Sequence, residues 1–432
     1  MLGAFANAFR TPDLRRKLLF VLFIITIFRL GSQVPAPGVH VSNVQQCLAG
    51  VENTGIFNLI NTFSGGALLQ LTIFALGIMP YITASIILQL LVVVIPRLDT
   101  LKKEGQAGQA KITQYTRYLT LGLAVLQATG IVALARSRRL IPGCENTDLL
   151  HSDSTGAFLI IVITMTAGTA VIMWLGELIT DRGVGNGMSL LIFAQVVATF
   201  PASLWEVQQT QGWVTFGIVM VIGLVIVAAV TFIEQAQRRI PVQYARRMVG
   251  RKMFGGSSTY IPLKVNQAGI IPVIFASSML YLPAMAVQFN EGNNNPVLRF
   301  INRYLATGDH PLYMTIYFLM IIFFTYLYVS ITFNPQEVAD NMKKYGGFIP
   351  GIRAGKPTEN YLSYVLSRIT FPGALYLGLI SLIPLIALAL IEANQNFPFG
   401  GTSILIMVGV ALDTVKQIES QLQQRNYEGF LK

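Results

Sequence analysis

The residue types that most often bind metals or phosphates are present in this sequence, but they are poorly placed for either task. His40, His151 and His310 lie far apart and lack the H-E-x-x-H spacing of a metal site, so we expect loop histidines and no bound metal. The glycine-rich stretch DRGVGNGMS, residues 181–189, has no preceding strand and no G-x-x-x-x-G-K pattern, and we expect it to be a turn that opens a helix. No cofactor is predicted.

Acidic residues are equally badly placed for chemistry inside a membrane. Hydrophobic residues make up 53% of the chain and charged residues 12%, against about 25% charged in soluble proteins, which predicts a polytopic membrane protein. Glu177, Asp181 and Glu234 lie near the ends of apolar runs rather than at their centres. Ion-coupled transporters bury charges near the midplane, and an enzyme needs a nucleophile and a base or paired acids. We therefore expect no enzymatic activity.

Three amides are the notable polar groups within or beside the apolar runs, namely Gln89, Gln127 and Asn266. Hydrogen bonds between such side chains on neighbouring membrane helices are worth about 1 kcal/mol each, which is weak enough to be opened. The amides are therefore either a reversible contact between helices or ordinary packing contacts, and the sequence leaves both open.

The stretch from Gly55 to Pro96 carries no charge and combines a short stub with a membrane span. Apolar residues recur at helical spacing over 56–63, then Ser64, Gly65 and Gly66 interrupt the pattern. A longer apolar run follows over 71–95 and is expected to cross the bilayer as one helix. A broken helix is tolerated in a membrane only where its backbone faces protein or water, so this unit predicts a pore or a transport path.

Ten charge-poor runs are candidates for spans across the roughly 30 Å of hydrocarbon in a bilayer. The first follows a basic N-terminus without a small-residue cleavage site, so we expect a retained span with Arg29 extending outward to the interface. The runs are approximately 18–34, 71–95, 112–135, 156–179, 187–204, 213–234, 267–288, 312–333, 369–391 and 400–415.

Lysine and arginine residues concentrate in two long connections, about 235–266 and 334–368, which places these loops and both chain termini in the cytoplasm. An arginine-rich stretch at 136–139 falls on the predicted outer side, but acidic residues nearby balance it, and we treat it as a local exception. Cys47 and Cys144 also fall outside. A disulfide is permitted there, and the sequence does not choose between that bond and two free thiols.

Five spans per half is an odd number, so a second half that repeats the first must be inverted. The expected halves are residues 1–204 and 205–432. A secondary solute transporter with inverted repeats is the alternative to a channel, and it predicts a charged or substrate-shaped midplane site and modest loops. The long basic loops could bind anionic lipid, or they could dock a large anionic partner such as a ribosome, which their length favours.

Seven segments, in an order typical of the family, resemble the signature sequences of the SecY / Sec61-alpha family, which includes the pore subunit of the bacterial Sec protein translocon. They extend from about residue 74 to residue 406, while the outer loops show the least family pattern. The segments are IFALGIMPYITASIILQLL, KKEGQAGQAKITQYTRY, MWLGELITDRGVGNGMS, RRIPVQYA, PLKVNQAGIIPVIFASS, FNPQEVADNMKKYGGFIPGIRAGKPT and FGGTSILI.

The resemblance implies an all-α fold of ten transmembrane helices, arranged as two inverted five-helix halves that form a clamshell around an hourglass pore. Such a protein-conducting channel passes unfolded secretory polypeptides across the bacterial cytoplasmic membrane. It also releases transmembrane segments into the lipid through a lateral gate, between spans 2 and 3 on one side and spans 7 and 8 on the other.

The resemblance also implies roles for particular residues. An apolar ring would close around a polypeptide of any sequence, the stub at about 56–70 would be a plug in the outer funnel, and Gln89, Gln127 and Asn266 would be the polar cluster of the gate. The implied ring residues are Ile78, Ile82, Met188, Ile192, Ile274 and Ile406, of which Met188 departs from the isoleucine common in the family. The implied plug residues are Phe57, Leu59, Ile60, Phe63, Ser64, Gly65 and Gly66, and the implied docking residues are Arg251, Lys252 and Arg353.

Several partners follow from the same resemblance. Small membrane subunits similar to SecE and SecG would brace the helices, and signal sequences and nascent polypeptides would enter the gate. The SecA ATPase or the ribosome would dock on the cytoplasmic loops and supply energy, because the sequence has no nucleotide-binding motif of its own. Anionic lipid would lie beside the basic loops.

Overall fold

The structure is a computed structural model that describes most of the chain. The described residues are Phe9 and residues 11–50, 65–138, 140, 147–152, 154–244, 247–249, 252–254, 258–289, 296–305, 310–391 and 401–429.

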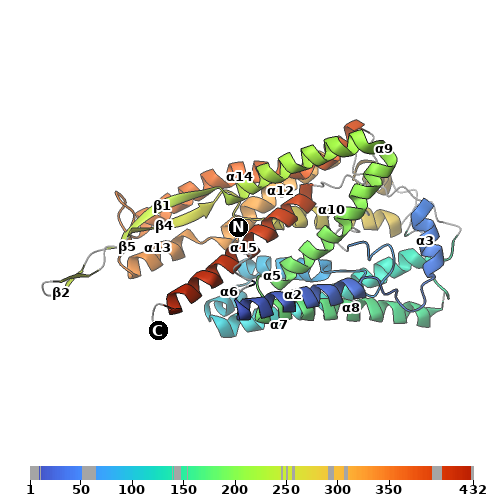
Figure 1. The fold of residues 1–432 in the computed structure, drawn as a ribbon, viewed down its shortest axis with the longest axis horizontal. Coiled ribbons are helices and arrows are strands. Elements are labelled where there is room, and N and C mark those ends of the chain that lie inside the picture. The colour runs from blue at the N-terminus through green and yellow to red at the C-terminus, as the bar shows by residue number, and fades with distance from the viewer. Residues whose placement is uncertain are drawn as a thin grey trace.

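Helices dominate the fold, and each of the ten expected apolar runs overlaps a helix when the two segments of the long helix α9 are counted separately (Figure 1). In the first part of the chain these helices are α2 (Pro12–Gly31), α3 (Val41–Gly50), α5 (Met79–Val94), α6 (Pro96–Lys103), α7 (Gln106–Arg136), α8 (Thr155–Arg182) and α9 (Gly187–Gln235). In the second part they are α10 (Ile271–Phe289), α11 (Pro296–Leu305), α12 (Pro311–Thr332), α13 (Pro335–Lys344), α14 (Lys356–Ile391) and α15 (Gly401–Gly429).

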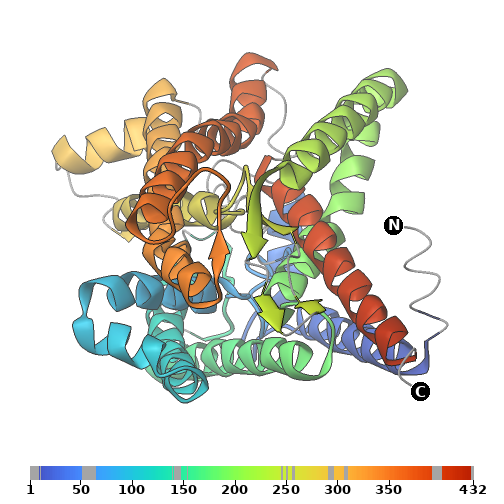
Figure 2. The same ribbon diagram turned by 90° about the vertical axis from the view of Figure 1, so that its left-hand side faces the viewer.

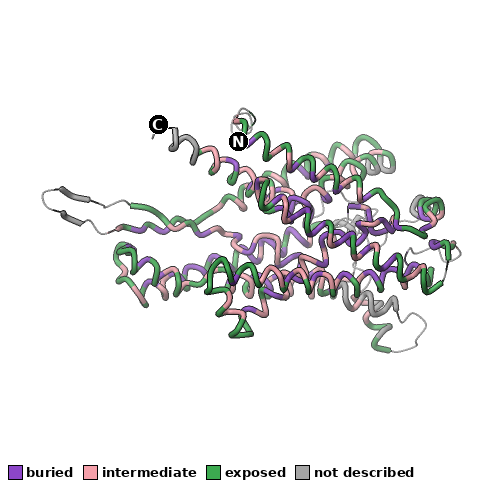
Figure 3. The backbone as a smooth tube through the Cα atoms, turned by 90° about the horizontal axis from the view of Figure 1, so that it is seen from below, coloured by how far each residue is buried: buried purple, intermediate pink, exposed green. Residues whose placement is uncertain are grey.

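The length and composition of the helices are those of a membrane protein. Within the described part of the chain, six helical segments are long and apolar enough to cross a bilayer, or seven if the α5–α6 pair, bent by 101°, is one span. Large apolar side chains such as Phe23, Trp213 and Phe232 are more than half exposed on the outer surface of the bundle. The exposed residues line the outer sides of the helices (Figure 3). An apolar outer surface of this kind suits contact with lipid rather than water.

Helix α9 contains two spans because the chain breaks inside it. Gly212 has φ 80°, in the left-handed region, and separates the segments Gly187–Trp205 and Gly212–Gln235. Glycine adopts this conformation without the steric cost that a Cβ atom imposes. The two arms fold back on each other in Figure 1 and correspond to the expected fifth and sixth spans.

The second span differs from its prediction, because the run over 71–95 is not one helix. Residues 65–78 form turns and α5 begins only at Met79. Leu71 and Gly77 have φ values of 49° and 55°, which no α-helix accommodates, and Pro80 lies in the first turn of α5, where its missing N–H costs nothing. This irregular backbone is surrounded by protein, the condition under which a membrane permits it.

The helices pack mainly within two groups. α7 packs between α5 and α8, and the bidentate ion pair of Arg117 with Glu177, at 2.8 Å for both contacts, joins α7 to α8. α12 packs between α10 and α14, and α15 packs on α9. Figure 2 shows the blue-to-green helices of the first group on one side and the yellow-to-orange helices of the second group on the other. Between the groups, α5 makes a smaller contact with α12.

The two long basic connections, expected to be cytoplasmic, are more ordered than simple loops, and they add β-structure to a fold expected to be all helical. Strands β1 (Gln237–Tyr244), β4 (Ser258–Lys264) and β5 (Gly347–Phe348) form an antiparallel sheet in the order β4-β1-β5, and β2 (Arg247–Val249) pairs with β3 (Lys252–Phe254) as a hairpin. The sheet joins both connections, because β5 comes from the second. α13 and the start of α14 also lie in the stretch expected to be the loop 334–368.

Candidate functional site

The apolar side chains predicted to form a ring come close together in the interior of the bundle. Ile78, at the start of α5, and Met188, in the first turn of α9, are 1% and 8% exposed and belong to one buried cluster, against which Ile82 and Ile192 pack. Ile406 of α15, which is 1% exposed, centres an adjoining cluster that also contains Ile192. Five of the six predicted residues therefore meet across three helices.

Ile274 is the sixth predicted ring residue. Its side chain on α10 is 4% exposed, but among the described residues it belongs to neither of the two clusters that hold the other five. Sequence reasoning also missed Met79, Val196, Met407 and Val410, which pack in the same clusters. Two of them could have been predicted from helical spacing. Val196 lies one turn after Ile192, and Val410 lies one turn after Ile406, so each shares a helix face with a predicted ring residue.

The glycine-rich stretch 181–189 is a turn that opens α9, as predicted. The Asn186 side chain accepts hydrogen bonds from the N–H groups of Met188 and Ser189 at 3.1 and 3.4 Å and so caps the helix. A Cβ at Gly187 would lie 1.9 Å from the Gly176 carbonyl oxygen, and a Cβ at Gly176 would lie 2.4 Å from the Met188 sulfur. These glycines let α8 and α9 approach so closely that the methionine passes over Gly176 into the ring.

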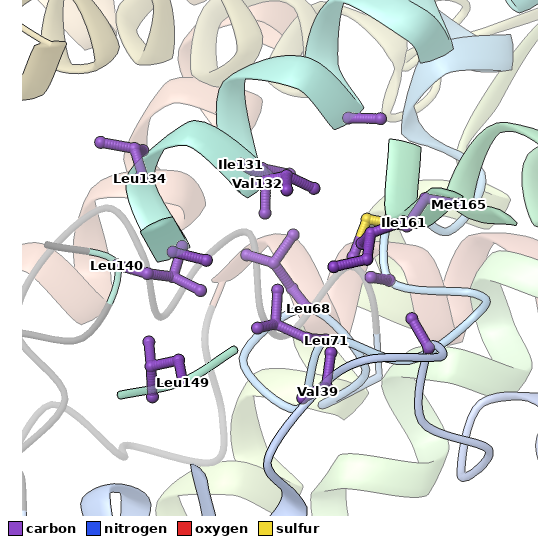
Figure 4. Close-up of a cluster of buried hydrophobic side chains, with 14 of the residues drawn as sticks. Val39, Leu68, Leu71, Ile131, Val132, Leu134, Leu140, Leu149, Ile161 and Met165 are labelled. Carbon is purple, nitrogen blue, oxygen red and sulfur yellow. The ribbon is translucent and has the colours of Figure 1, made fainter. Parts of the chain in front are cut away.

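Only the last two of the predicted plug residues are described. Phe57, Leu59, Ile60, Phe63 and Ser64 lie outside the described residues, whereas Gly65 and Gly66 have left-handed φ values of 67° and 87°. After them Leu68 and Leu71 are buried at 2% and 1% exposure and point toward Ile131, Val132, Ile161 and Met165 of α7 and α8 (Figure 4). The chain that follows the stub is thus held in the core of the first group of helices.

Arg29 does not extend to the interface as the sequence predicted. It is half-buried near the end of α2, and its Nη1 donates a 2.8 Å hydrogen bond to the carbonyl oxygen of Gly65. Gly65 and Gly66 both have left-handed φ values, and the turn that they form presents this carbonyl oxygen to Arg29. No pattern in the sequence indicated this contact.

The three amides predicted at the gate are not joined by hydrogen bonds in the part of the chain that the structure describes. Gln89 on α5 is exposed and Gln127 on α7 is half-buried. Asn266, which is 4% exposed, instead donates from Nδ2 to the Glu234 carboxylate at 2.6 Å and more weakly to the Gly269 carbonyl at 3.4 Å. Asn266 therefore ties the start of the seventh span to the end of the sixth.

The residues predicted to dock partners lie on a folded unit that has its own core and is formed by the two long basic connections. Arg353 is exposed between Gly351 and Gly355, both with positive φ, and its carbonyl accepts a 2.9 Å hydrogen bond from Thr358. Arg251 lies outside the described residues, and Lys252 begins β3, with its side chain not described. The core beneath the sheet takes residues from both connections, namely Ile240, Val242, Leu263, Met342, Ile349, Leu362, Val365 and Ile369.

Contacts among the residues expected on the outer side bear on several of the predictions made for the loops. Arg138 forms an ion pair with Asp148, which matches the predicted local balance of charge. The rings of His40 and His151 stack with centroids 3.4 Å apart, although the two residues are far apart in sequence. Cys47 is in a disulfide, and the chain's other cysteine, Cys144, lies outside the described residues. No group of three or more His, Cys, Asp or Glu side chains in the described part of the chain could hold a metal ion.

The fold is thus a bundle of long apolar helices with buried apolar clusters where α5, α9 and α15 meet, and with a folded unit of strands and helices outside the apolar spans. A solved structure described as "The structure of a protein conducting channel" has the same fold, with a TM-score of 0.63 and 20% sequence identity over 94% of this chain and 91% of that one. A second, described as showing that "the plug domain of the SecY protein" stabilises the closed state of its channel, matches with a TM-score of 0.62 and 17% identity over 94% and 91% of the two chains.

Sequence comparison gives the family. The SecY family model matches residues 72–415. The chain is 67% identical to the "Protein translocase subunit SecY" of Streptomyces scabiei and 58% identical to that of Mycobacterium tuberculosis, in both cases over the full length of both chains. The chain belongs to the SecY family, and it is a protein translocase channel subunit rather than an enzyme or a solute transporter.

Proposed function

We propose that the buried constriction is the point at which an unfolded polypeptide crosses the membrane, with Ile78, Ile82, Met188, Ile192, Ile274 and Ile406 as its ring. The observation that carries this assignment is the meeting of Ile78, Met188 and Ile192 with Ile406, which brings three helices to one apolar centre. An apolar constriction resists wetting and blocks ions, while aliphatic and methionine side chains adapt to a passing chain of any sequence.

Opening of this constriction requires parts that move. The stub at about 56–70 acts as a plug, and residues 1–204 and 205–432 act as halves that separate about the break at Gly212 in α9. The small contact between α5 and α12 suits a lateral gate through which transmembrane segments leave. Gln89, Gln127 and Asn266 line this gate, with Asn266 held by Glu234 in the resting state.

The partners are assigned on the cytoplasmic unit. Arg353, Lys252 and Arg251 dock the SecA ATPase or the ribosome, in keeping with structural neighbours described as "Sec61 in the Canine ribosome-channel complex" and as a yeast Ssh1 complex bound to the 80S ribosome. Subunits similar to SecE and SecG brace the helices, and anionic lipid lies beside the basic loops. The chain works in the bacterial cytoplasmic membrane with both termini in the cytoplasm.

A cross-linking experiment tests the polypeptide path. The channel complex is reconstituted in vesicles with SecA and ATP, and a secretory precursor is stalled during translocation. A photoreactive amino acid at Ile192 should cross-link to the stalled precursor. The same probe at Val225, which is also an aliphatic residue of α9 but is 63% exposed, should label lipid instead. Equal labelling from both positions, or none from Ile192, would contradict the path.

A further inference from the structure

Arg29 is a charged residue within an apolar span, and its side chain turns inward. It is half-buried, and its Nη1 lies 2.8 Å from the Gly65 carbonyl oxygen. No ion pair with a described carboxylate involves it. Long basic side chains near the end of a span usually extend to the interface. The inward direction therefore points to a role at Gly65.

Gly65 lies in a narrow space between α2 and α9. A Cβ atom there would meet the Arg29 Nη1 at 3.1 Å and both the Cα and Cβ atoms of Gln195 at 3.4 Å. A Cβ at Gly66 would meet nothing within 4 Å. Both glycines have left-handed φ values and together form a turn. Neighbouring atoms pack closely around Gly65, whereas there is open space beside Gly66.

Gln195 is the second unusual feature at this position. It is 1% exposed, and neither its Nε2 nor its Oε1 has a hydrogen-bond partner in the part of the chain that the structure describes. Buried amides nearly always find partners, and an unsatisfied one raises the free energy of the state that contains it. Gln195 also precedes Val196 of the constriction. The turn at Gly65 therefore lies between the Arg29 guanidinium, which donates a hydrogen bond to it, and the Gln195 amide, which has no described partner. Both groups are close to the proposed ring.

We propose that Arg29 is a latch on the plug, and that its hydrogen bond to Gly65 holds the turn at Gly65 and Gly66 in the resting position. Hydrogen bonds from a charged donor are about twice as strong as neutral ones, which suits a contact that must hold yet break. Movement of the plug removes the Gly65 carbonyl from Arg29 and frees the backbone beside Gln195. Loss of the latch shifts the two-state equilibrium of the channel toward the open state. This inference rests on the proposed role of the stub as a plug.

A double-mutant cycle on the resting channel tests the latch. Ion conductance of vesicles containing the full channel complex is measured for the native chain, Arg29→Gln, a deletion of residues 57–63, and the two changes combined. Arg29→Gln should raise the resting conductance about tenfold, which corresponds to about 1.4 kcal/mol. In the deletion background it should add nothing, because the latch no longer has a plug to hold.

The controls separate the latch from other effects of the substitution. Arg29→Lys keeps the charge but lacks the planar donor fork, and it should leak less than Arg29→Gln. Thr26→Val, one turn earlier, alters an exposed residue whose hydroxyl bonds only to its own helix at Leu22, and it should not leak. The membrane level of each variant is measured to exclude loss of folding.

Each contrary result has a distinct meaning. If the deletion leaks and Arg29→Gln does not, the latch is wrong and the plug stands. If the leak of Arg29→Gln persists unchanged in the deletion background, Arg29 acts elsewhere in the pore and the latch is again wrong. If the deletion itself does not leak, both the plug and the latch are wrong.

Discussion

Ile192 packs against both of the apolar clusters that hold the proposed ring residues. An amide at this position would attract water into an otherwise apolar seal, so Ile192→Asn should raise the resting ion conductance several-fold. Export should fall by less than twofold, since the ring only has to fit around the chain. Conductance and precursor translocation are measured on the same vesicles. Ile192→Leu conserves volume and should preserve the seal; a leak in that variant would mean that side-chain shape rather than apolarity closes the pore.

Asn266 and Glu234 form a part-buried contact that joins the end of α9 to the start of the seventh span. Asn266→Leu leaves the carboxylate without this donor, and we expect a loss of about 1 to 3 kcal/mol in stability. Thermal unfolding of the purified complex measures it. Glu234→Gln on its own should cost less, because its amide oxygen still accepts from Asn266. In the double variant the two costs should not add, and full additivity would show that the pair is not coupled.

At the scale of elements, the close approach of α8 and α9 depends on two glycines. Gly187→Ala places a methyl group 1.9 Å from the backbone oxygen of Gly176, and backbone cannot move aside as a flexible side chain can. Such overpacking typically costs about 1 to 3 kcal/mol and occasionally more. We expect a reduced membrane level and a lower unfolding temperature. Gly217→Ala, in the same helix with nothing within 4 Å of the added Cβ, is the matched control and should be neutral or slightly stabilising.

The success of prediction from sequence also varies by element. Apolar runs gave the number and order of the spans, because the length of a membrane helix is set by the bilayer and needs no knowledge of its neighbours. The same rule failed over 71–78, where composition is apolar but Leu71 and Gly77 take left-handed φ values within a protein-lined interior. The hydropathy of a segment indicates whether it is buried, but it does not indicate the conformation of its backbone.

Contacts between distant residues were the other part that the sequence could not provide. The direction of Arg29 toward Gly65, and the pairing of Asn266 with Glu234, depend on which helices lie side by side. Likewise, the shared core of the two cytoplasmic connections could not be read from two separate loops, since β1 and β5 are about a hundred residues apart in the chain. The convergence of Ile78, Ile192 and Ile406 was foreseen only through resemblance to a family, because each alone is an ordinary apolar residue.

At the scale of the whole molecule, the proposed docking requires that the unit formed by the two long basic connections transmit force or position from a partner to the spans. Its sheet continues directly from α9 through Gln237, and its core includes Leu362 and Ile369 of α14, a helix that continues into the membrane. A partner bound to the exposed end of this unit is therefore connected rigidly to both helices. This arrangement allows docking to bias the opening of the channel without any contact at the constriction.

Arg353 is the residue at which this connection can be tested. It is exposed between two glycines in left-handed conformation, so replacing it should not disturb the core. Arg353→Glu should abolish SecA-driven or ribosome-driven export while the membrane level and the resting conductance stay unchanged. Lys343→Glu makes the same change of charge at another exposed position of the unit, on α13, and should retain at least half of the export. Equal loss in both variants would indicate a general effect of net charge, and normal export by Arg353→Glu would remove the docking assignment.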